Sequence, residues 1–419
     1  MKRISAILYI IISATTLFGA TPGMITYNST QCEGSAMPYP APKESISYPD
    51  SLTPVMVNHV GRHGARYPAS ASRPLAIKRA LEHADSLGTI TPLGKELLQV
   101  TENVITRSNG KWGALDSLGM AEQRGIAARM FTNYPNLFSN GKITALSSYA
   151  PRCIMSMYSF THQLARMNNR LEIFTSSGRQ NSPLMRPFDI DQDYIDYREN
   201  KPYEDVLKGF IAETATTAPI KRVLGENYPL DEEQFRDLAL TEYGLLAGLS
   251  AMGYNIDVMR FFTTEEYNRL WSCNNLKQYL ERTANTISTV PADIAADLLL
   301  NLITTTDDVA ERRSDMRVQL RFGHAETLMP LLSLMHLPGC YYMTNYFDTV
   351  ASHWQNFHVV PMASNLQIIL FRTKNGKLYV RIDLNEVPVT LIPGDERIYL
   401  PWSTAKQYLT RCLPLYMQI

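Results

Sequence analysis

A short basic run, RHGAR from Arg62 to Arg66, contains the side chains best suited to chemistry on a tetrahedral anion. A guanidinium group is a rigid fork that can hold two phosphate oxygens, and the run has one at each end. The neutral imidazole of His63 carries a lone pair and can act as a nucleophile near physiological pH. Because positions 55–57 are apolar and predict a buried strand, the run would stand at a strand end, where ligands of α/β sheets bind. Taken alone, the run could equally be a basic surface loop.

Two further predicted strand ends carry residues of the same kind. His324 and Glu326 follow the alternating apolar pattern of residues 316–322, which predicts a strand. The histidine can donate to a phosphate oxygen, and the glutamic acid can protonate a departing alkoxide. Arg152 follows a strand-like run at 143–148 and precedes a helical pattern. Each feature alone is ordinary, as an acidic helix N-terminus or a surface arginine, but the three strand ends together predict one phosphate site.

The elements that would position these residues form two α/β segments with a helical stretch between them. Strand-like and helical patterns alternate in both outer segments, and Asn375-Gly376 between two apolar runs is a strong hairpin signal. Strands that alternate with helices at both ends of a helical middle imply an α/β core interrupted by a cap. We therefore expect a discontinuous α/β domain, residues 24–170 and 305–419, with a mainly α-helical cap domain, residues 171–304.

The composition excludes several classes of protein. The 419 residues include 40 Lys plus Arg and 40 Asp plus Glu, so the formal net charge is zero. A protein that binds nucleic acid non-specifically would show a basic excess, whereas a site for a small anion needs only a local concentration of positive charge. Hydrophobic residues make up 45% of the chain and charged residues 19%, which excludes disorder as the main state.

The N-terminus, residues 1–23, has the pattern of an export signal. Lys2 and Arg3 precede an uncharged stretch, residues 4–18, and small residues follow it. The stretch is shorter than the roughly 20 residues that a membrane-spanning helix needs. We therefore expect a secretory signal rather than a stable membrane anchor, and a mature protein in the bacterial periplasm, on the outer surface or in the medium.

Export would permit disulfide bonds, and the chain has five cysteines. The odd count leaves at least one thiol free or paired between chains. A bridge between Cys340 and Cys412 and a set of buried free thiols are both compatible with the sequence. The Cys and His residues show no spacing typical of a metal site.

The residues from Arg62 to Pro68 match RHGxRxP, the signature of the histidine acid phosphatases. Most members of that superfamily pair it with a distant His-Asp dipeptide. The counterpart here is His-Ala-Glu at His324–Glu326, a form that is similar to the multiple inositol polyphosphate phosphatases, a phytase-like branch. Arg152 resembles the superfamily's third phosphate-binding arginine. The resemblance runs over residues 51–412 and implies a phosphoglycerate-mutase-like α/β sandwich domain with an inserted α-helical cap.

The resemblance also implies a role for each candidate residue. His63 would attack phosphorus and become phosphohistidine, and Glu326 would protonate the leaving oxygen. Neither a metal nor another cofactor would be needed, because arginines would offset the transition-state charge. The residues expected to hold the phosphoryl oxygens are Arg62, Arg66, Arg152 and His324.

The implied substrate is a small polyanion, phytate (inositol hexakisphosphate) or a related inositol polyphosphate. Arg186 lies in a segment that resembles the same branch, and it could bind an additional phosphate. One alternative is a general acid or sugar phosphatase of broad specificity. Another is an exported protein that binds phosphate esters without turnover, although binding alone needs neither His63 nor Glu326. A phosphoglycerate-mutase-like transferase would share the motif, but export would separate it from its metabolites.

Overall fold

The computed structural model describes residues 25–44, 47–139 and 141–417. The export signal expected at residues 1–23 lies outside this part of the chain. Within the described residues, we find no helix with the length and apolar character needed to cross a membrane.

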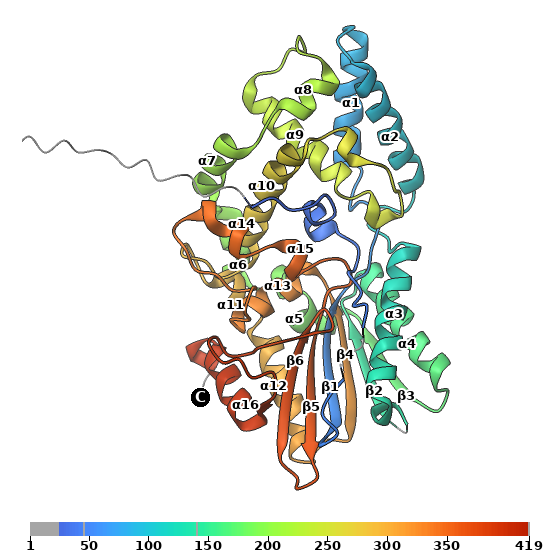
Figure 1. Ribbon diagram of the computed structural model, residues 1–419, viewed down its shortest axis with the longest axis vertical. Helices are drawn as coiled ribbons and strands as arrows, with labels where there is room; N and C mark the ends of the chain where they lie inside the picture. Colours follow the sequence, from blue (N-terminus) through green and yellow to red (C-terminus); the bar gives the residue numbers. More distant parts are fainter. Residues whose placement is uncertain (1–24, 45–46, 140, 418–419) are drawn as a thin grey trace, which may run out of the picture.

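A mixed β-sheet forms one half of the molecule and carries both sequence motifs on neighbouring strands (Figure 1). The strand order is β3-β2-β4-β1-β5-β6-β7, and β8 pairs with β6. Strand β1 is parallel to β4, which is parallel to β2, and antiparallel to β5. The strands are β1 (Leu52–Arg62), β2 (Lys142–Ser147), β3 (Glu172–Ser177), β4 (Met316–Gly323), β5 (Asn365–Thr373), β6 (Leu378–Leu384), β7 (Val387–Val389) and β8 (Leu400–Pro401).

Helices cover both faces of this sheet. On one face, Val57 of β1 shares a core with Val318, Leu320 and Phe322, which point to the same side of β4 as their alternation predicts. Met56 lies on the opposite face of β1 and belongs to a second core, which the helices on that face share. The first face is covered by α3 (Ser117–Asn133) and α4 (Pro151–Met167), and the second by α5 (Ser182–Met185), α12 (Ala296–Ala310), α13 (Ala325–Leu334) and α16 (Trp402–Cys412).

A second, helical layer stands beyond the carboxyl end of β1 and has its own core (Figure 1). Two of its helices start as the sequence dictates: Thr91 caps α2 before Pro92, and Thr263 with Glu266 forms a capping box on α10. The main helices of this layer are α1 (Ser72–Ser86), α2 (Pro92–Ser108), α7 (Glu204–Thr214), α8 (Ala218–Leu224), α9 (Glu232–Leu246) and α10 (Thr264–Arg282). Shorter helices between the layers are α6 (Gln192–Asn200), α11 (Val290–Asp293), α14 (Val350–His353) and α15 (Asn356–Val359).

The layers do not follow the expected cap boundaries at residues 171 and 304. Helices α1 and α2 belong to the helical layer, because Ile77 and Leu97 share a core with Val223 and Leu246. Strand β3 lies beyond residue 171, yet it pairs with β2 as the edge of the sheet. Helix α12 runs across residue 304 and packs on β1. The reason is physical: the apolar face of each helix selects its layer, irrespective of its place in the chain.

Two further local predictions can be compared with the structure. The hairpin between β5 and β6 is confirmed, and Gly376 at its turn has φ of 84°. All five cysteines are buried with free thiols, so the alternative of buried thiols holds and no Cys340–Cys412 bridge is present.

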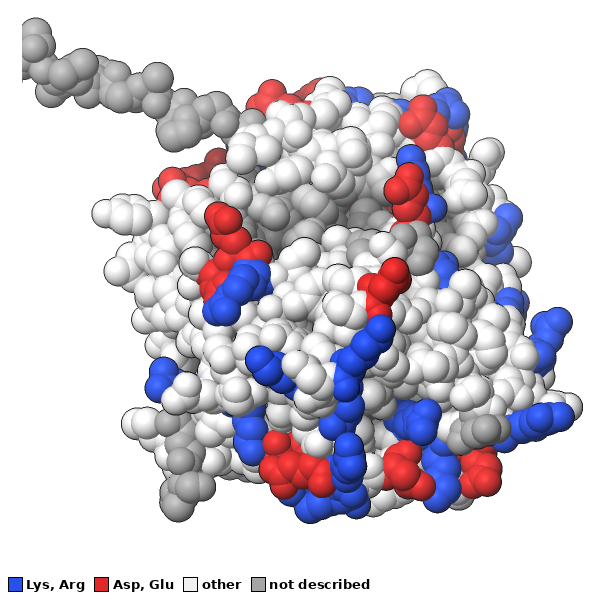
Figure 2. Space-filling view, turned by 60° about the horizontal axis from the view of Figure 1, so that its bottom comes forward, with Lys and Arg blue, Asp and Glu red and all other residues white. Residues whose placement is uncertain are grey.

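On the face drawn in Figure 2, acidic and basic side chains are interspersed, in line with the zero formal charge.

Candidate active site

The two motifs leave the sheet side by side. Arg62 and Gly323 are register partners at the ends of β1 and β4, and the amide of His63 donates to the carbonyl of Gly323 over 3.0 Å. On the other side, the amide of Ala363 donates to the carbonyl of His63 over 3.1 Å. The parallel pairing of β1 with β4 therefore brings together residues that are more than 250 positions apart in the sequence.

Close packing against α3 and α4 fixes the loop that follows β1. The amide of Gly64 donates to Ser156 Oγ over 3.1 Å, and the amide of Ala65 donates to Glu122 Oε2 over 2.7 Å. A Cβ on Gly64 would lie 2.4 Å from the carbonyl oxygen of Gly119, which is an impossible contact. Gly64 is thus required by the close approach of α3.

The imidazole of His63 is held in one orientation and one tautomer. Its Nδ1 lies 2.9 Å from the carbonyl oxygen of Gly64, and because a carbonyl only accepts, Nδ1 carries the proton and donates. The Nε2 atom is left with the free lone pair. Burial, followed by the charges of Arg62 and Arg152, keeps the pKa of His63 well below its usual range. The ring is therefore neutral, as a nucleophile must be.

Three arginines surround this imidazole: Arg62, which is buried, and Arg66 and Arg152, which are partly buried. Arg62 donates from Nη1 to the carbonyl of Val360 over 2.6 Å, and Arg66 donates to the carbonyl of Tyr67 over 2.8 Å. Among the described residues, no acceptor lies within reach of the buried Nε–H of Arg62, Arg66 or Arg152. Burial and mutual repulsion lower the pKa of Arg62 to about 9 and that of Arg66 to about 10. Crowding of buried cations on this scale is costly without a counter-charge, which an anionic ligand would supply.

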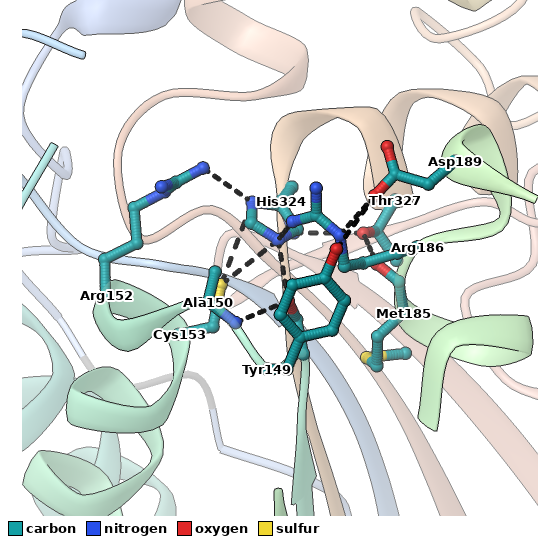
Figure 3. A network of polar contacts seen from close by, with 10 residues as sticks. Tyr149, Ala150, Arg152, Cys153, Met185, Arg186, Asp189, His324 and Thr327 are labelled. Carbon is teal, nitrogen blue, oxygen red and sulfur yellow. Dashed lines mark hydrogen bonds and ion pairs between the residues drawn. The ribbon is translucent and has the colours of Figure 1, made fainter. Parts of the chain in front are cut away.

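His324 is the centre of a second set of polar contacts (Figure 3). Its Nε2 lies 2.9 Å from Ser148 Oγ and 2.7 Å from Arg186 Nη1, and its Nδ1 lies 3.2 Å from Arg152 Nη2. A neutral imidazole has one acceptor nitrogen, so only one arginine can donate to it at a time. Burial, then the charge of Arg152, lowers the pKa of His324 to about 3. The His63 and His324 rings meet edge to face, with centroids 5.8 Å apart.

Glu326 stands in the first turn of α13, where it faces the helical layer. Its Oε1 lies 3.0 Å from Nη2 of Arg282, the last residue of α10. Burial alone would raise the pKa of Glu326, but the charges of Arg282 and His324, together with its hydrogen bond to the main chain, outweigh burial and lower the pKa to about 2. The carboxyl group is therefore ionised in this state of the protein.

Most of these side chains open onto a cavity between the two layers, but His324 is absent from its wall. Its volume is about 300 Å³, and it continues into a cleft of about 430 Å³ that shares Arg66, Arg282 and Glu326 in its wall. Among the sequence-predicted residues, the wall of the smaller cavity contains Arg62, His63, Arg66, Arg152 and Glu326. Arg186 is absent from both walls, and its contacts with His324 and Asp189 place it behind His324 instead.

Sequence reasoning missed the part of the wall that comes from the helical layer. Arg73 from α1 and Arg282 from α10 line both the cavity and the cleft. The guanidinium of Arg73 rests on Gly244 of α9, where a Cβ would lie 3.1 Å from its Cζ. Each is one of two arginines in its helix and has no motif around it, so no local pattern distinguishes it. His59 is buried between Phe160 and Phe322, with 5.3 Å between its ring centroid and each of theirs, and it is absent from the cavity wall.

The described residues offer little to a metal ion. No group of three or more His, Cys, Asp or Glu side chains in this part of the chain is arranged to hold one. A reaction without metal or other cofactor stays a prediction.

Comparison with known proteins agrees with the geometry. Residues 55–385 match the histidine phosphatase superfamily (branch 2). Human multiple inositol polyphosphate phosphatase 1 is 25% identical over 384 residues, which is 83% of this chain and 77% of the human protein.

Two crystal structures share the fold. Bifidobacterium longum multiple inositol polyphosphate phosphatase in complex with inositol hexasulfate aligns with a TM-score of 0.78 at 17% identity, over 92% of this chain and 99% of that chain. The phytase from D. castellii aligns with a TM-score of 0.72 at 17% identity, over 92% of this chain and 86% of that chain. The predicted α/β phosphatase fold with a helical part is confirmed. The chain therefore belongs to branch 2 of the histidine phosphatase superfamily, and the prediction of a phosphatase enzyme is confirmed.

Proposed function

We propose that this protein hydrolyses phytate and other inositol polyphosphates through a covalent phosphohistidine on His63. The observation that carries the proposal is the hydrogen bond from His63 Nδ1 to the Gly64 carbonyl. It leaves a free lone pair on Nε2 of a neutral imidazole in the wall of an arginine-lined cavity. A site that only bound phosphate would have no use for this arrangement.

The reaction would proceed in two steps. His63 Nε2 attacks phosphorus, the bond from phosphorus to the inositol oxygen breaks, and Glu326 gives a proton to the leaving oxygen. Water then attacks the phosphohistidine, the Glu326 carboxylate accepts a proton from it, and the bond to Nε2 breaks to release phosphate. Arg62, Arg66 and Arg152 would balance the charge of the phosphoryl oxygens as it develops.

The charge of the cavity wall supports a substrate with several phosphates. Three arginines come from the strand ends and two more, Arg73 and Arg282, from the helical layer. A single phosphate would be satisfied by the first group alone, so the second group is available to further phosphates. The relatives named multiple inositol polyphosphate phosphatase and the inositol hexasulfate complex of the Bifidobacterium longum protein point to the same class of ligand.

The experiment compares phytate with a simple aryl phosphate as substrates of the purified protein. We expect phytate to be hydrolysed at least as efficiently as the aryl ester, with inositol phosphate products identified over time. Quenching with acid is unsuitable because phosphohistidine is labile in acid. The intermediate is therefore trapped under alkaline denaturing conditions and located by mass spectrometry. Phytate turnover far below that of the aryl ester would favour the broad-specificity alternative. A His63→Ala variant that kept the native rate would exclude His63 as the nucleophile.

The export of the protein is part of the same proposal. It rests on the basic start, the uncharged stretch at residues 4–18 and the small residues that follow. Expression of the full chain in a bacterium, with fractionation and sequencing of the mature N-terminus, tests it. We expect a periplasmic or secreted protein that has lost its first 20 or so residues; an intact N-terminus in the cytoplasm would contradict it.

A further inference from the structure

One ion pair joins the helical layer to the proposed proton donor. Arg282 ends α10, and Glu326 lies in the first turn of α13, with 3.0 Å between Nη2 and Oε1. The two side chains are 22% and 33% exposed, so each faces both its partner and the cavity. Both residues line the cavity and the cleft. The pair therefore stands where the outer phosphates of a polyanionic substrate would enter.

Three arginines face Glu326: Arg62 at the end of β1, Arg66 in the loop that follows, and Arg282 across the cavity. The imidazole of His324, whose pKa is lowered to about 3, stands beside it. Arg282 provides the largest of the interactions that hold the pKa of Glu326 at about 2 against the effect of burial. Cys153 on α4 and Tyr194 on α6 also feel its charge, and burial raises the pKa of each to about 12, so both are neutral. Glu33 lines the cavity as well, and burial raises its pKa to about 7.

Arg282 has another carboxylate close by. Burial alone would lower its pKa, but the charges of Glu326 and then Glu281 outweigh burial and raise it. Glu281 is held by Tyr203, whose hydroxyl donates to Oε1 over 3.3 Å. Arg282 is therefore balanced by a second carboxylate in its own layer, and it can turn toward a new anion without losing all charge compensation.

This ion pair presents a chemical problem for the proposed reaction. An acid must hold its proton until the leaving oxygen takes it, but the pairing with Arg282 favours the ionised form of Glu326. A bound polyanion reverses this balance, because phosphates near Arg62, Arg66 and Arg282 neutralise the cations that stabilise the carboxylate.

We propose that Arg282 is a positioning residue that couples the charge of the bound substrate to the protonation of Glu326. Before substrate binds it pairs with Glu326. A phosphate other than the one under attack then draws the guanidinium away, and Glu326 takes up a proton from solvent. That proton is the one passed to the leaving oxygen. The inference rests on the proposed function and extends it, since a substrate with several phosphates prepares its own acid, whereas a simple monoester does so less completely.

Proton uptake on ligand binding tests the coupling directly. The probe is inositol hexasulfate, whose sulfates do not titrate, and the method is calorimetry at about pH 5, just above the ordinary pKa of glutamic acid, in buffers of different ionisation enthalpy. We expect the native protein to take up at least about half a proton more than a Glu326→Gln variant. The variant serves as the reference because His63 and His324 can also gain protons when an anion binds. Equal uptake by the two proteins would overturn the proposal.

The pH dependence of turnover tests the role of Arg282. The kcat/KM profile reports the free enzyme, so Arg282→Gln should shift its alkaline limb with a simple alkyl phosphate, whose leaving oxygen needs a proton, to higher pH by about one unit or more. Arg282→Lys keeps the charge and should leave the limb near that of the native protein. Lys208→Gln removes an exposed charge from α7 of the same helical layer, outside the cavity wall, and is the matched control. A uniform loss of rate at every pH in Arg282→Gln would show a merely structural or binding role.

These outcomes are separable from failure of the proposed function. The uptake measurement uses a ligand that does not react, so it needs no turnover. If Arg282→Gln does not fold, the comparison of the native protein with Glu326→Gln still decides the coupling. Loss of turnover in His63→Ala, by contrast, bears on the nucleophile and leaves the protonation of Glu326 untouched.

Discussion

The amide of His63 donates to the carbonyl of Gly323 over 3.0 Å, and this bond continues the parallel ladder of β1 and β4 by one residue. The proposed nucleophile is therefore tied by its main chain to the strand that precedes the proposed acid. Because main-chain ladders are stiffer than long side chains, the distance between the two motifs is fixed before a substrate binds. Such preorganisation is what transfer between positioned groups requires.

Gly64→Ala should destabilise the protein and remove its activity. The added Cβ would lie 2.4 Å from the carbonyl oxygen of Gly119, so either the loop after β1 or helix α3 must move. We expect a loss of about 1–3 kcal/mol in the free energy of unfolding, measured by urea denaturation, as for other overpacked sites. Gly209→Ala is the control: Gly209 lies within α7, nothing would contact its Cβ, and the change should stabilise by about 0.5–1 kcal/mol. Equal stability of the two variants would contradict this account of Gly64.

Glu326→Gln should affect substrates according to their leaving groups. An inositol alkoxide needs a proton when it departs, so we expect kcat with phytate to fall by about 10²–10⁴. A nitrophenolate leaves without a proton, so kcat with nitrophenyl phosphate should fall much less, as long as hydrolysis of the phosphohistidine does not limit the rate. Steady-state kinetics with both substrates, supported by burst measurements of the first turnover, provide the comparison. A first-turnover loss of the same size for both esters would show that Glu326 is not the acid.

The stability of the protein should decrease as the pH falls from about 6.5 to about 3. Burial, followed by the charge of Arg321, lowers the pKa of His59 from 6.5 to about 3. Between those values the unfolded chain binds a proton that the folded chain rejects, so His59 contributes a slope of about 1.4 kcal/mol per pH unit. His59→Phe, in a pocket formed with Phe160 and Phe322, removes this contribution.

The measurement for His59 is the slope of unfolding free energy against pH, not the stability at one pH. A larger ring can change the packing energy at every pH equally, and the slope is insensitive to that. His83, whose ring contacts Tyr228 in the helical layer, is a suitable control position for a Phe substitution. An unchanged slope in His59→Phe would mean that His59 is already charged in the folded protein.

The sequence identified the residues at the strand ends but not those across the cavity, for a physical reason. A strand end is marked by a local apolar run, and RHGxRxP adds a motif, so His63 and its neighbours could be found without coordinates. Arg73 and Arg282 face the cavity only because α1 and α10 belong to the helical layer that stands beyond the carboxyl end of β1. Nothing near either residue in the sequence records that packing.

The division into layers was hard to predict for the same reason. Helices α1 and α2 directly follow the first motif, and proximity suggested the α/β domain for them. Their apolar faces instead pack against α8 and α9, in a contact between segments more than 100 residues apart. Periodicity predicts that a helix has an apolar face, but it does not predict which partner covers that face.

Arg186 provides the clearest choice between a prediction from sequence and a contact in the structure. The sequence suggests that it binds an additional phosphate, in which case Arg186→Ala should raise KM for phytate alone. The structure places its Nη1 2.7 Å from His324 Nε2, so we expect instead that kcat falls about tenfold or more for both phytate and an aryl phosphate. Arg179→Ala is a matched control, because the guanidinium groups of Arg179 and Arg186 each lie 4.7 Å from the ring centroid of Tyr149. Of these two arginines, Arg186 is the one whose guanidinium contacts His324. An unchanged kcat with a KM increase confined to phytate would assign Arg186 to the substrate rather than to His324.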